Sequence, residues 1–173
     1  MAALRAGGVI AFPTDTVYGL AASAFDLDAA ARIYDIKGRP PGMPLILMVA
    51  TAAEVSDWAI VDSRARDHMA RWWPGGLTLI LPTREHSTIG VRMPKQALAL
   101  ELLAAAGPLL TTSANRHGEP PALTAEEAER LPGLAGVLDG GRVPGGVPST
   151  LLDLTGKEPR ILREGAVPAS ELL

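Results

Sequence analysis

The sequence predicts an α/β domain built on one mixed, twisted β-sheet that helices cover. Two observations carry this prediction. In the first part of the chain, short apolar runs bounded by glycine or proline, which are typical of buried strands, alternate with segments of helical character. The last part holds mainly strand-like runs, which breaks the strict βαβ repeat of an all-parallel sheet. Since no linker or internal repeat is visible, we expect one domain over residues 1–173.

The individual elements follow from local signals. Strands are expected where aliphatic residues run together between turn residues, at 9–12, 17–22, 44–49, 77–81, 89–93, 109–112, 136–139, 149–154 and 160–163. Helices are expected between capping and stop signals, at 2–6, 26–36, 51–59, 63–73, 95–106 and from 124 onward. Asp26 can cap the helix over 26–36, which then delivers Lys37 and Arg39 at its C-terminal end.

Composition excludes several classes of function. Hydrophobic residues make up 47% of the chain and aromatic residues only 4%, so the core must be aliphatic. The formal net charge of -3 argues against a broad basic face for nucleic acid. The absence of cysteine excludes disulfides, thiolate zinc sites and cysteine nucleophiles, and the three histidines show no metal-ligand spacing. Without a secretory signal or an apolar run of about 20 residues, a soluble, cytoplasmic protein is expected.

Polar residues gather at four places where a predicted strand begins or ends. The four are Thr14-Asp15-Thr16, Lys37-Gly38-Arg39, Ser113-Ala114-Asn115, and Ser149-Thr150 together with Arg163. Strand ends are where functional sites tend to form. Taken singly, the hydroxyl-bearing residues have a simpler interpretation, because they can satisfy backbone groups in turns. Arg92 is a charge inside the predicted strand 89–93, and taken alone it is best interpreted as half of a structural salt bridge.

The segment 37–42 offers the chemistry of an anion site. Lys37 supplies a movable point charge and Arg39 a planar fork, which together suit a polyphosphate or a carboxylate. Gly38 lets the backbone approach a ligand, and the prolines that follow stiffen the loop. The alternative for an isolated motif of this kind is a solvated basic loop.

The order and spacing of eight short motifs are highly specific when taken together. These motifs are PTDTVYGL at 13–20, KGRP at 37–40, WPGGLTL at 73–79, VRMP at 91–94, TSAN at 112–115, GEPP at 118–121, PST at 148–150 and ILREG at 161–165. With them, the chain resembles the YrdC family, the L-threonylcarbamoyladenylate synthases, over nearly its whole length. The resemblance is to the short, single-domain form.

The resemblance implies a fold and a reaction. The fold would be a twisted, open mixed sheet flanked by helices, with a deep, positively charged cavity. The reaction would convert L-threonine, bicarbonate and ATP, with Mg²⁺, into threonylcarbamoyl-AMP and pyrophosphate. The product would pass to a separate transferase that modifies an adenosine in tRNA, so weak or no direct tRNA binding is expected of this chain.

The resemblance also implies roles for particular residues. Lys37 and Arg39 would be catalytic and, with Arg163, would hold the phosphates of ATP. Other contacts to the nucleotide would come from Thr88, Ser113 and Asn115, and contacts to threonine from Thr16, Arg92 and Ser149. No residue is expected to bind a metal directly. Met43 and Met48 stand where many relatives carry a polar residue, and methionine cannot donate a hydrogen bond.

Two other functions remain open at this point. One is a paralogue that forms a different carbamoyl adenylate, as in the related domain of hydrogenase maturation proteins. The other is a non-catalytic RNA-binding module, which the acidic balance and the scarcity of aromatic residues disfavour.

Overall fold

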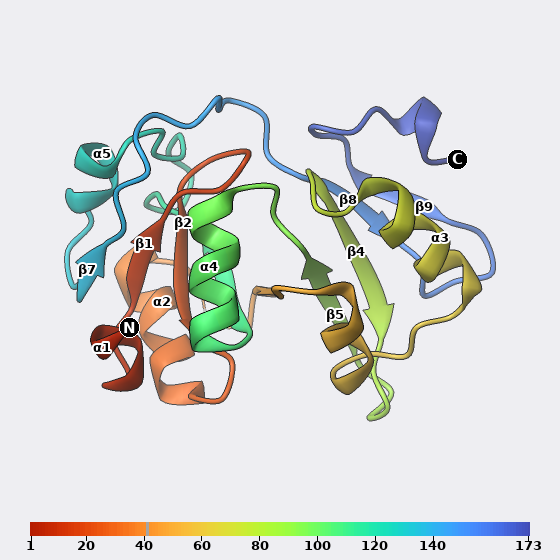
Figure 1. Ribbon diagram of the computed structural model, residues 1–173, viewed down its shortest axis with the longest axis horizontal. Coiled ribbons are helices and arrows are strands. Elements are labelled where there is room, and N and C mark those ends of the chain that lie inside the picture. The colour runs from red at the N-terminus through yellow and green to blue at the C-terminus, as the bar shows by residue number, and fades with distance from the viewer. Residues whose placement is uncertain (41) are drawn as a thin grey trace.

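Nine strands within the described residues, 1–40 and 42–173, form one mixed sheet in the computed structural model of the chain (Figure 1). Their order across the sheet is β7-β1-β2-β6-β3-β5-β4-β8-β9. The pairs β1/β7, β3/β5 and β4/β8 are parallel, and the other neighbours are antiparallel. The predicted mixed α/β sheet is therefore confirmed. The strands are β1 Ile10–Phe12, β2 Gly19–Ser23, β3 Ile46–Met48, β4 Leu77–Pro82, β5 Thr88–Arg92, β6 Leu109–Ser113, β7 Gly136–Val137, β8 Thr150–Asp153 and β9 Arg160–Arg163.

Helix α2 begins and ends at the predicted capping and stop signals. Asp26 caps α2 by accepting from the Ala29 backbone N–H at 2.9 Å. Gly38 ends α2 in the left-handed region at φ 59°, a conformation that favours glycine. Pro41, in the predicted loop 37–42, lies outside the described residues. The helices are α1 Ala2–Arg5, α2 Leu27–Lys37, α3 Ser63–Trp72, α4 Ala97–Ala106 and α5 Ala125–Glu129, with 3-10 turns η1 Ala52–Asp57 and η2 Ala169–Glu171.

Strand β2 and helix α4 each start two residues later than predicted because side chains hold the preceding turn. Strand β2 begins at Gly19 because the Thr14 hydroxyl folds residues 14–17 into a turn: it donates to the Val17 carbonyl at 2.6 Å and accepts from the Val17 backbone N–H at 3.3 Å. Helix α4 begins at Ala97 because the Gln96 side chain caps it. The turn chemistry expected for Thr14 is thus confirmed.

The two halves of the sheet are covered differently. Residues of α1 and α4 pack on one face of β1 and β2, and residues of α2 and α5 pack on the other. On β4 and β5, side chains such as Leu79 and Val91 pack with α3 and η1 on one face. Because side chains alternate along a strand, those of Thr78 and Arg92 point to the opposite face. The more polar face of β4 and β5 therefore carries the charge that the sequence marked as unusual.

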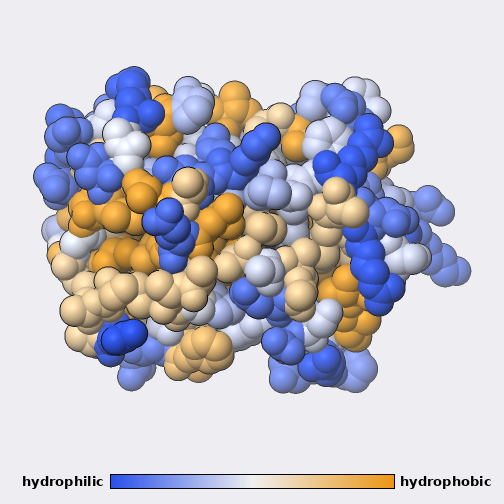
Figure 2. Space-filling model, in the orientation of Figure 1, coloured by the Kyte–Doolittle hydropathy of each residue, from blue (hydrophilic) through white to orange (hydrophobic). Residues whose placement is uncertain are grey.

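A long connection joins the halves. The segment that follows β7 crosses from the half with β1 and β2 to the half with β8 (Figure 1). In the same orientation, Figure 2 shows most of the strongly apolar side chains on the half that holds β1 and α4, with polar side chains around them. Within residues 1–40 and 42–173, no helix is long and apolar enough to cross a membrane.

Candidate active site

Eight of the nine predicted site residues, all except Thr88, fall into two groups that lie near the ends of strands. The first group surrounds Arg92, at the end of β5, and contains Thr16, Ser149 and Arg163. The second surrounds Lys37, at the end of α2, and contains Arg39, Ser113 and Asn115. Residues 13–18 run between the groups, since Thr16 contacts Arg92 and the Tyr18 carbonyl accepts from the Ala114 backbone N–H at 2.8 Å.

Arg92 is a buried cation with three different partners. Its side chain is held by the Gly75 carbonyl at 2.9 Å from Nε, by Thr16 Oγ1 at 3.1 Å from Nη1 and by Asp15 Oδ1 at 2.7 Å from Nη2. Burial lowers the pKa of Arg92, while the Asp15 carboxylate acts in the opposite direction by favouring the charged form. The salt bridge expected for Arg92 is therefore present, and the same guanidinium lies beside the Thr16 hydroxyl.

Ser149 and Arg163 form the other side of this group. Arg163 donates to the Ser149 carbonyl from Nε at 3.2 Å and from Nη2 at 2.7 Å. The Ser149 hydroxyl lies 2.8 Å from the hydroxyl of Thr78, which is fully buried. Burial lowers the pKa of Arg163, and the positive charge of Arg92 lowers it further. Two guanidinium groups whose like charges act on each other are suited to binding an anion between them.

Gly165 fixes the distance between the chain at 148–150 and the chain after β9. A Cβ at position 165 would lie 2.2 Å from the Pro148 carbonyl oxygen and 2.7 Å from the Thr150 nitrogen. Only glycine allows this approach, which keeps Ser149 beside Arg163. The glycine of the ILREG motif thus has a steric reason for its position.

Lys37 is buried, with 4% of its surface exposed, and it contacts the end of β6. Its Nζ donates to the Ser113 carbonyl at 2.6 Å, to the Asn115 carbonyl at 2.9 Å and to Asn115 Oδ1 at 2.9 Å. Burial lowers the pKa of Lys37 to about 8, and the charge of Arg39 contributes. The structure therefore brings together the KGR and SAN motifs, which are far apart in the sequence.

Arg39 is only partly buried and its donors are less fully used. Nη1 lies 3.2 Å from Thr112 Oγ1, and Nη2 lies 3.3 Å from the Pro44 carbonyl. Nε is buried and has no hydrogen-bond partner among the described residues. A guanidinium held by neutral oxygen atoms keeps its full charge for a ligand.

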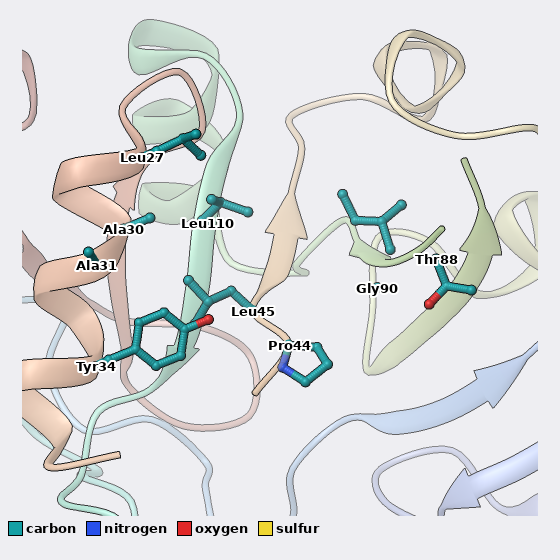
Figure 3. Close-up of a pocket in the computed structure, with 10 residues that line it drawn as sticks. Leu27, Ala30, Ala31, Tyr34, Pro44, Leu45, Thr88, Gly90 and Leu110 are labelled. Atoms are coloured by element: carbon teal, nitrogen blue, oxygen red, sulfur yellow. The ribbon is translucent and has the colours of Figure 1, made fainter. Parts of the chain in front are cut away.

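Thr88 lies apart from Arg92, at the other end of β5. It lines a pocket of about 360 Å³ formed by residues of α2, β5 and β6 and by Pro44 and Leu45, which precede β3 (Figure 3). Figure 3 shows Leu27, Tyr34 and Leu110 on one side of this pocket and Thr88 on the other. Among the described residues, none that lines the pocket is charged. It is therefore not the positively charged cavity that the resemblance implies, which stays a prediction.

The two methionines that stand in place of polar residues have different surroundings. Met48 is 6% exposed and packs in the cluster that includes Phe12, Leu103 and Leu109. Met43 is 38% exposed, and its carbonyl accepts from the Tyr34 hydroxyl at 2.8 Å. Position 48 thus contributes to the aliphatic core, whereas position 43 contributes a backbone contact.

Sequence reasoning missed two partners within the site. Asp15 belongs to the predicted polar cluster 14–16 but was given no partner there; it pairs with Arg92 and also accepts from the Lys95 backbone N–H at 2.9 Å. Thr78 was assigned only to a strand, but it supports the Ser149 hydroxyl. The available signal for both residues was their position in the family motifs. Asp15 lies in PTDT, which also contains Thr16, and Thr78 lies in WPGGLTL, which leads into a buried strand.

Comparisons with known proteins agree with this geometry. The family model Sua5/YciO/YrdC, described as "Telomere recombination", matches residues 2–165. The threonylcarbamoyl-AMP synthase of Bacillus subtilis is 40% identical over 185 residues, which cover 99% of this chain and 54% of that protein. The structure of Pyrococcus abyssi Sua5 complexed with L-threonine superimposes with a TM-score of 0.94 at 37% identity, covering 99% of this chain and 54% of the other. Escherichia coli YciO gives a TM-score of 0.88 at 35% identity, covering 98% and 89%.

The chain belongs to the Sua5/YciO/YrdC family. The family membership expected from the motifs is thereby confirmed, as is the family's α/β fold. The chain spans about half the length of the Bacillus and Pyrococcus relatives.

Proposed function

We propose that this chain is a nucleotidyltransferase that forms threonylcarbamoyl-AMP and pyrophosphate from L-threonine, bicarbonate and ATP. The observation that carries the proposal is the buried Arg92 guanidinium, which lies against the Thr16 hydroxyl and close to the Arg163–Ser149 pair. An amino acid with a hydroxyl and a carboxylate needs one fork-shaped cation and several hydroxyl partners. The similarity to a Pyrococcus protein crystallised with L-threonine supports the same substrate.

At the threonine end, Arg92 would bind the α-carboxylate. The hydroxyls of Thr16 and Ser149 would form hydrogen bonds with threonine. A site built around polar groups of its substrate discriminates against analogues that lack them, because its own buried groups then stay unpaired. Asp15 would hold the Arg92 guanidinium in place while two of its N–H groups remain for the ligand.

At the nucleotide end, Arg39 and Arg163 would bind the phosphates of ATP, and Lys37 would add its charge from within the protein. Ser113 and Asn115 would lie against the nucleotide, and Thr88 would contact it at the pocket in Figure 3. Mg²⁺ bound to ATP would supply charge neutralisation. The residues described here suit an ion held by phosphate and water oxygens, because the nearby carboxylate, Asp15, is already engaged by Arg92 and the Lys95 N–H.

The chemistry would proceed in two steps. The threonine amine takes up bicarbonate with loss of water and becomes an N-carboxylate. An oxygen of that carboxylate then forms a bond to the α-phosphorus, and the bond from the α-phosphorus to the bridging oxygen breaks as pyrophosphate leaves. Both reactants are anions, so the arginines serve chiefly to bring them together and to stabilise the developing charge. A cytoplasmic tRNA-modifying transferase would receive the product.

Incubation with ATP, bicarbonate, Mg²⁺ and labelled threonine tests the proposal directly. A labelled threonylcarbamoyl adenylate and equimolar pyrophosphate are expected, and neither should form when threonine or bicarbonate is omitted. Pyrophosphate release that ignores threonine would instead indicate a different carbamoyl adenylate. Strong, salt-sensitive tRNA binding without ATP turnover would indicate an RNA-binding module.

A further inference from the structure

The ammonium group of Lys37 has used all of its donors inside the protein. A lysine ammonium has three N–H groups and no acceptor. The three oxygen atoms that surround Nζ, at 2.6, 2.9 and 2.9 Å, all belong to Ser113 and Asn115. A phosphate could gain one of these N–H groups only if the turn at 113–115 gave it up.

The backbone and the side chain of Lys37 together hold a longer loop. The Lys37 carbonyl accepts from the His117 backbone N–H at 2.8 Å. Asn115 Oδ1 accepts from Lys37 Nζ and, at 2.6 Å, from the Ser113 hydroxyl. Asn115 Nδ2 donates to the Arg116 carbonyl at 2.9 Å and to the Glu119 carbonyl at 2.6 Å. The amide of Asn115 is thus fully engaged, and Lys37 is the residue that ties it to α2.

The partners of Lys37 are uncharged. In the described part of the chain, no carboxylate forms an ion pair with Lys37. The charged group that acts on it is Arg39, which lowers the pKa of Lys37 further after burial has lowered it. Arg39 differs because Nη1 and Nη2 each carry two N–H groups and each form one hydrogen bond to a described residue. Of the two cations, Arg39 is the one with a donor to offer.

We propose that Lys37 is a positioning residue, which acts on the nucleotide by holding the Ser113–Asn115 turn and does not itself contact the phosphates. The proposal rests on the proposed function to the extent that this turn is taken to contact the nucleotide. The Ser113 hydroxyl donates to Asn115 and keeps its oxygen as an acceptor. That acceptor suits a ribose hydroxyl or the adenine amino group, which AMP and ATP share.

The test compares Lys37→Met with Arg39→Met. Two quantities are measured: backbone hydrogen exchange of residues 113–119 in the ligand-free protein, and the dissociation constants of AMP, ATP and L-threonine by calorimetry. Lys37→Gln keeps two N–H donors without the charge, so it serves as the conservative variant. It also replaces Lys37→Met in every measurement if that variant does not fold.

A positioning role predicts a particular pattern. Lys37→Met should speed hydrogen exchange at 113–119 on the order of tenfold or more. It should weaken the affinities for AMP and ATP by the same factor and leave the affinity for threonine unchanged. Lys37→Gln should recover part of both effects. Arg39→Met should leave exchange at 113–119 as in the wild type and weaken ATP much more than AMP, because it removes a phosphate contact.

Other patterns overturn the proposal. Unchanged exchange in Lys37→Met would show that Lys37 does not hold the turn, and a loss of ATP affinity several times larger than the loss for AMP would make Lys37 a phosphate ligand. Wild-type protein that binds neither AMP nor ATP would also overturn it. Failure of the proposed function is a separate outcome: the wild type would bind both nucleotides, with the pattern above, yet form no threonylcarbamoyl adenylate.

Discussion

Lys37 and Arg92 are two buried cations that the protein stabilises in different ways. Their exposed fractions are nearly equal, at 4% and 3%. Arg92 has a carboxylate partner, Asp15, at 2.7 Å. Lys37 is surrounded by three neutral oxygen atoms and lies near a second cation. The free-energy cost of burying the charge is therefore offset by an ion pair at Arg92 and by hydrogen bonds to neutral oxygen atoms at Lys37.

The difference follows from the chemistry of the two side chains. A guanidinium stays protonated over the whole accessible pH range, so a buried arginine needs a counter-charge or a ligand. A lysine can release its proton when burial is costly. Arg92, whose charge is permanent, is paired with a carboxylate, whereas Lys37, which can lose its proton, is surrounded by carbonyl oxygen atoms. Arg92 is thus prepared for an anionic ligand at any pH, whereas the charge of Lys37 depends on pH near 8.

Breaking the charge pair is expected to give the largest effect. Arg92→Met should reduce threonine-dependent pyrophosphate release by about 100-fold or more, because it removes the carboxylate fork and leaves Asp15 without its cation. Urea unfolding should show a loss of about 3 kcal/mol. Arg160→Met is the matched control, since Arg160 pairs with Asp153 at 3.1 Å but is 73% exposed. Its stability should change by less than about 0.5 kcal/mol. Undiminished activity in Arg92→Met would remove Arg92 from the site.

The contact between Ser149 and Arg163, in the group around Arg92, depends on the close approach of the backbone at Gly165. Gly165→Ala should force the chain at 148–150 away and separate Ser149 from Arg163, lowering the free energy of unfolding by about 3 kcal/mol and raising the KM for threonine. Gly156→Ala is the control, because the nearest atom to its added Cβ is 3.6 Å away. Threonine kinetics and urea unfolding of both variants measure the contrast. Equal behaviour of the two variants would show that the close approach at Gly165 is not needed.

Most elements of this fold could be predicted from the sequence because their signals are local. Asp26 caps α2 three residues ahead of its partner, and Thr14 folds its own turn within three residues. Continuous apolar runs mark strands such as β1 and β2 because both faces of the sheet are covered there and successive residues are buried. The polar clusters at predicted strand ends indicated the candidate site residues, and the family motifs implied their roles.

The partners within the site could not be predicted because they are distant and chemically ordinary. Asp15 and Arg92 lie 77 residues apart, and Thr78 and Ser149 lie 71 apart. The oxygen atoms around Lys37 include two backbone carbonyls, which every residue carries and no pattern marks. The sequence places Lys37 and Ser113 in two motifs of the same protein family, but only the structure shows that the two residues are in contact.

The unpaired charge of Lys37 predicts an unusual pH dependence of stability. Its folded pKa is about 8 and its ordinary value 10.5, so between these values the unfolded chain holds a proton that the folded protein has released. The free energy of unfolding should therefore rise with pH in this window, by up to about 3 kcal/mol relative to Lys37→Met. Below pH 8 the folded protein should bear the full free-energy cost of burying the charged Lys37 ammonium. Urea unfolding of both proteins from pH 7 to 10.5 measures the difference. Parallel curves would mean that burial does not penalise the Lys37 charge.

The smallest expected effect concerns Thr78, an uncharged residue whose hydroxyl contacts Ser149 in the group around Arg92. Thr78→Val removes the hydroxyl that lies 2.8 Å from Ser149 Oγ but keeps the shape of the side chain. The Ser149 hydroxyl would then keep only the longer contact of 3.4 Å to Arg163 Nη2. We expect a loss of about 1 kcal/mol in stability and a rise of about fivefold in the KM for threonine, with the KM for ATP unchanged. Thr78→Ser, which keeps the hydroxyl, should restore the KM; if both variants raise it equally, packing by the Thr78 methyl rather than its hydrogen bond orients Ser149.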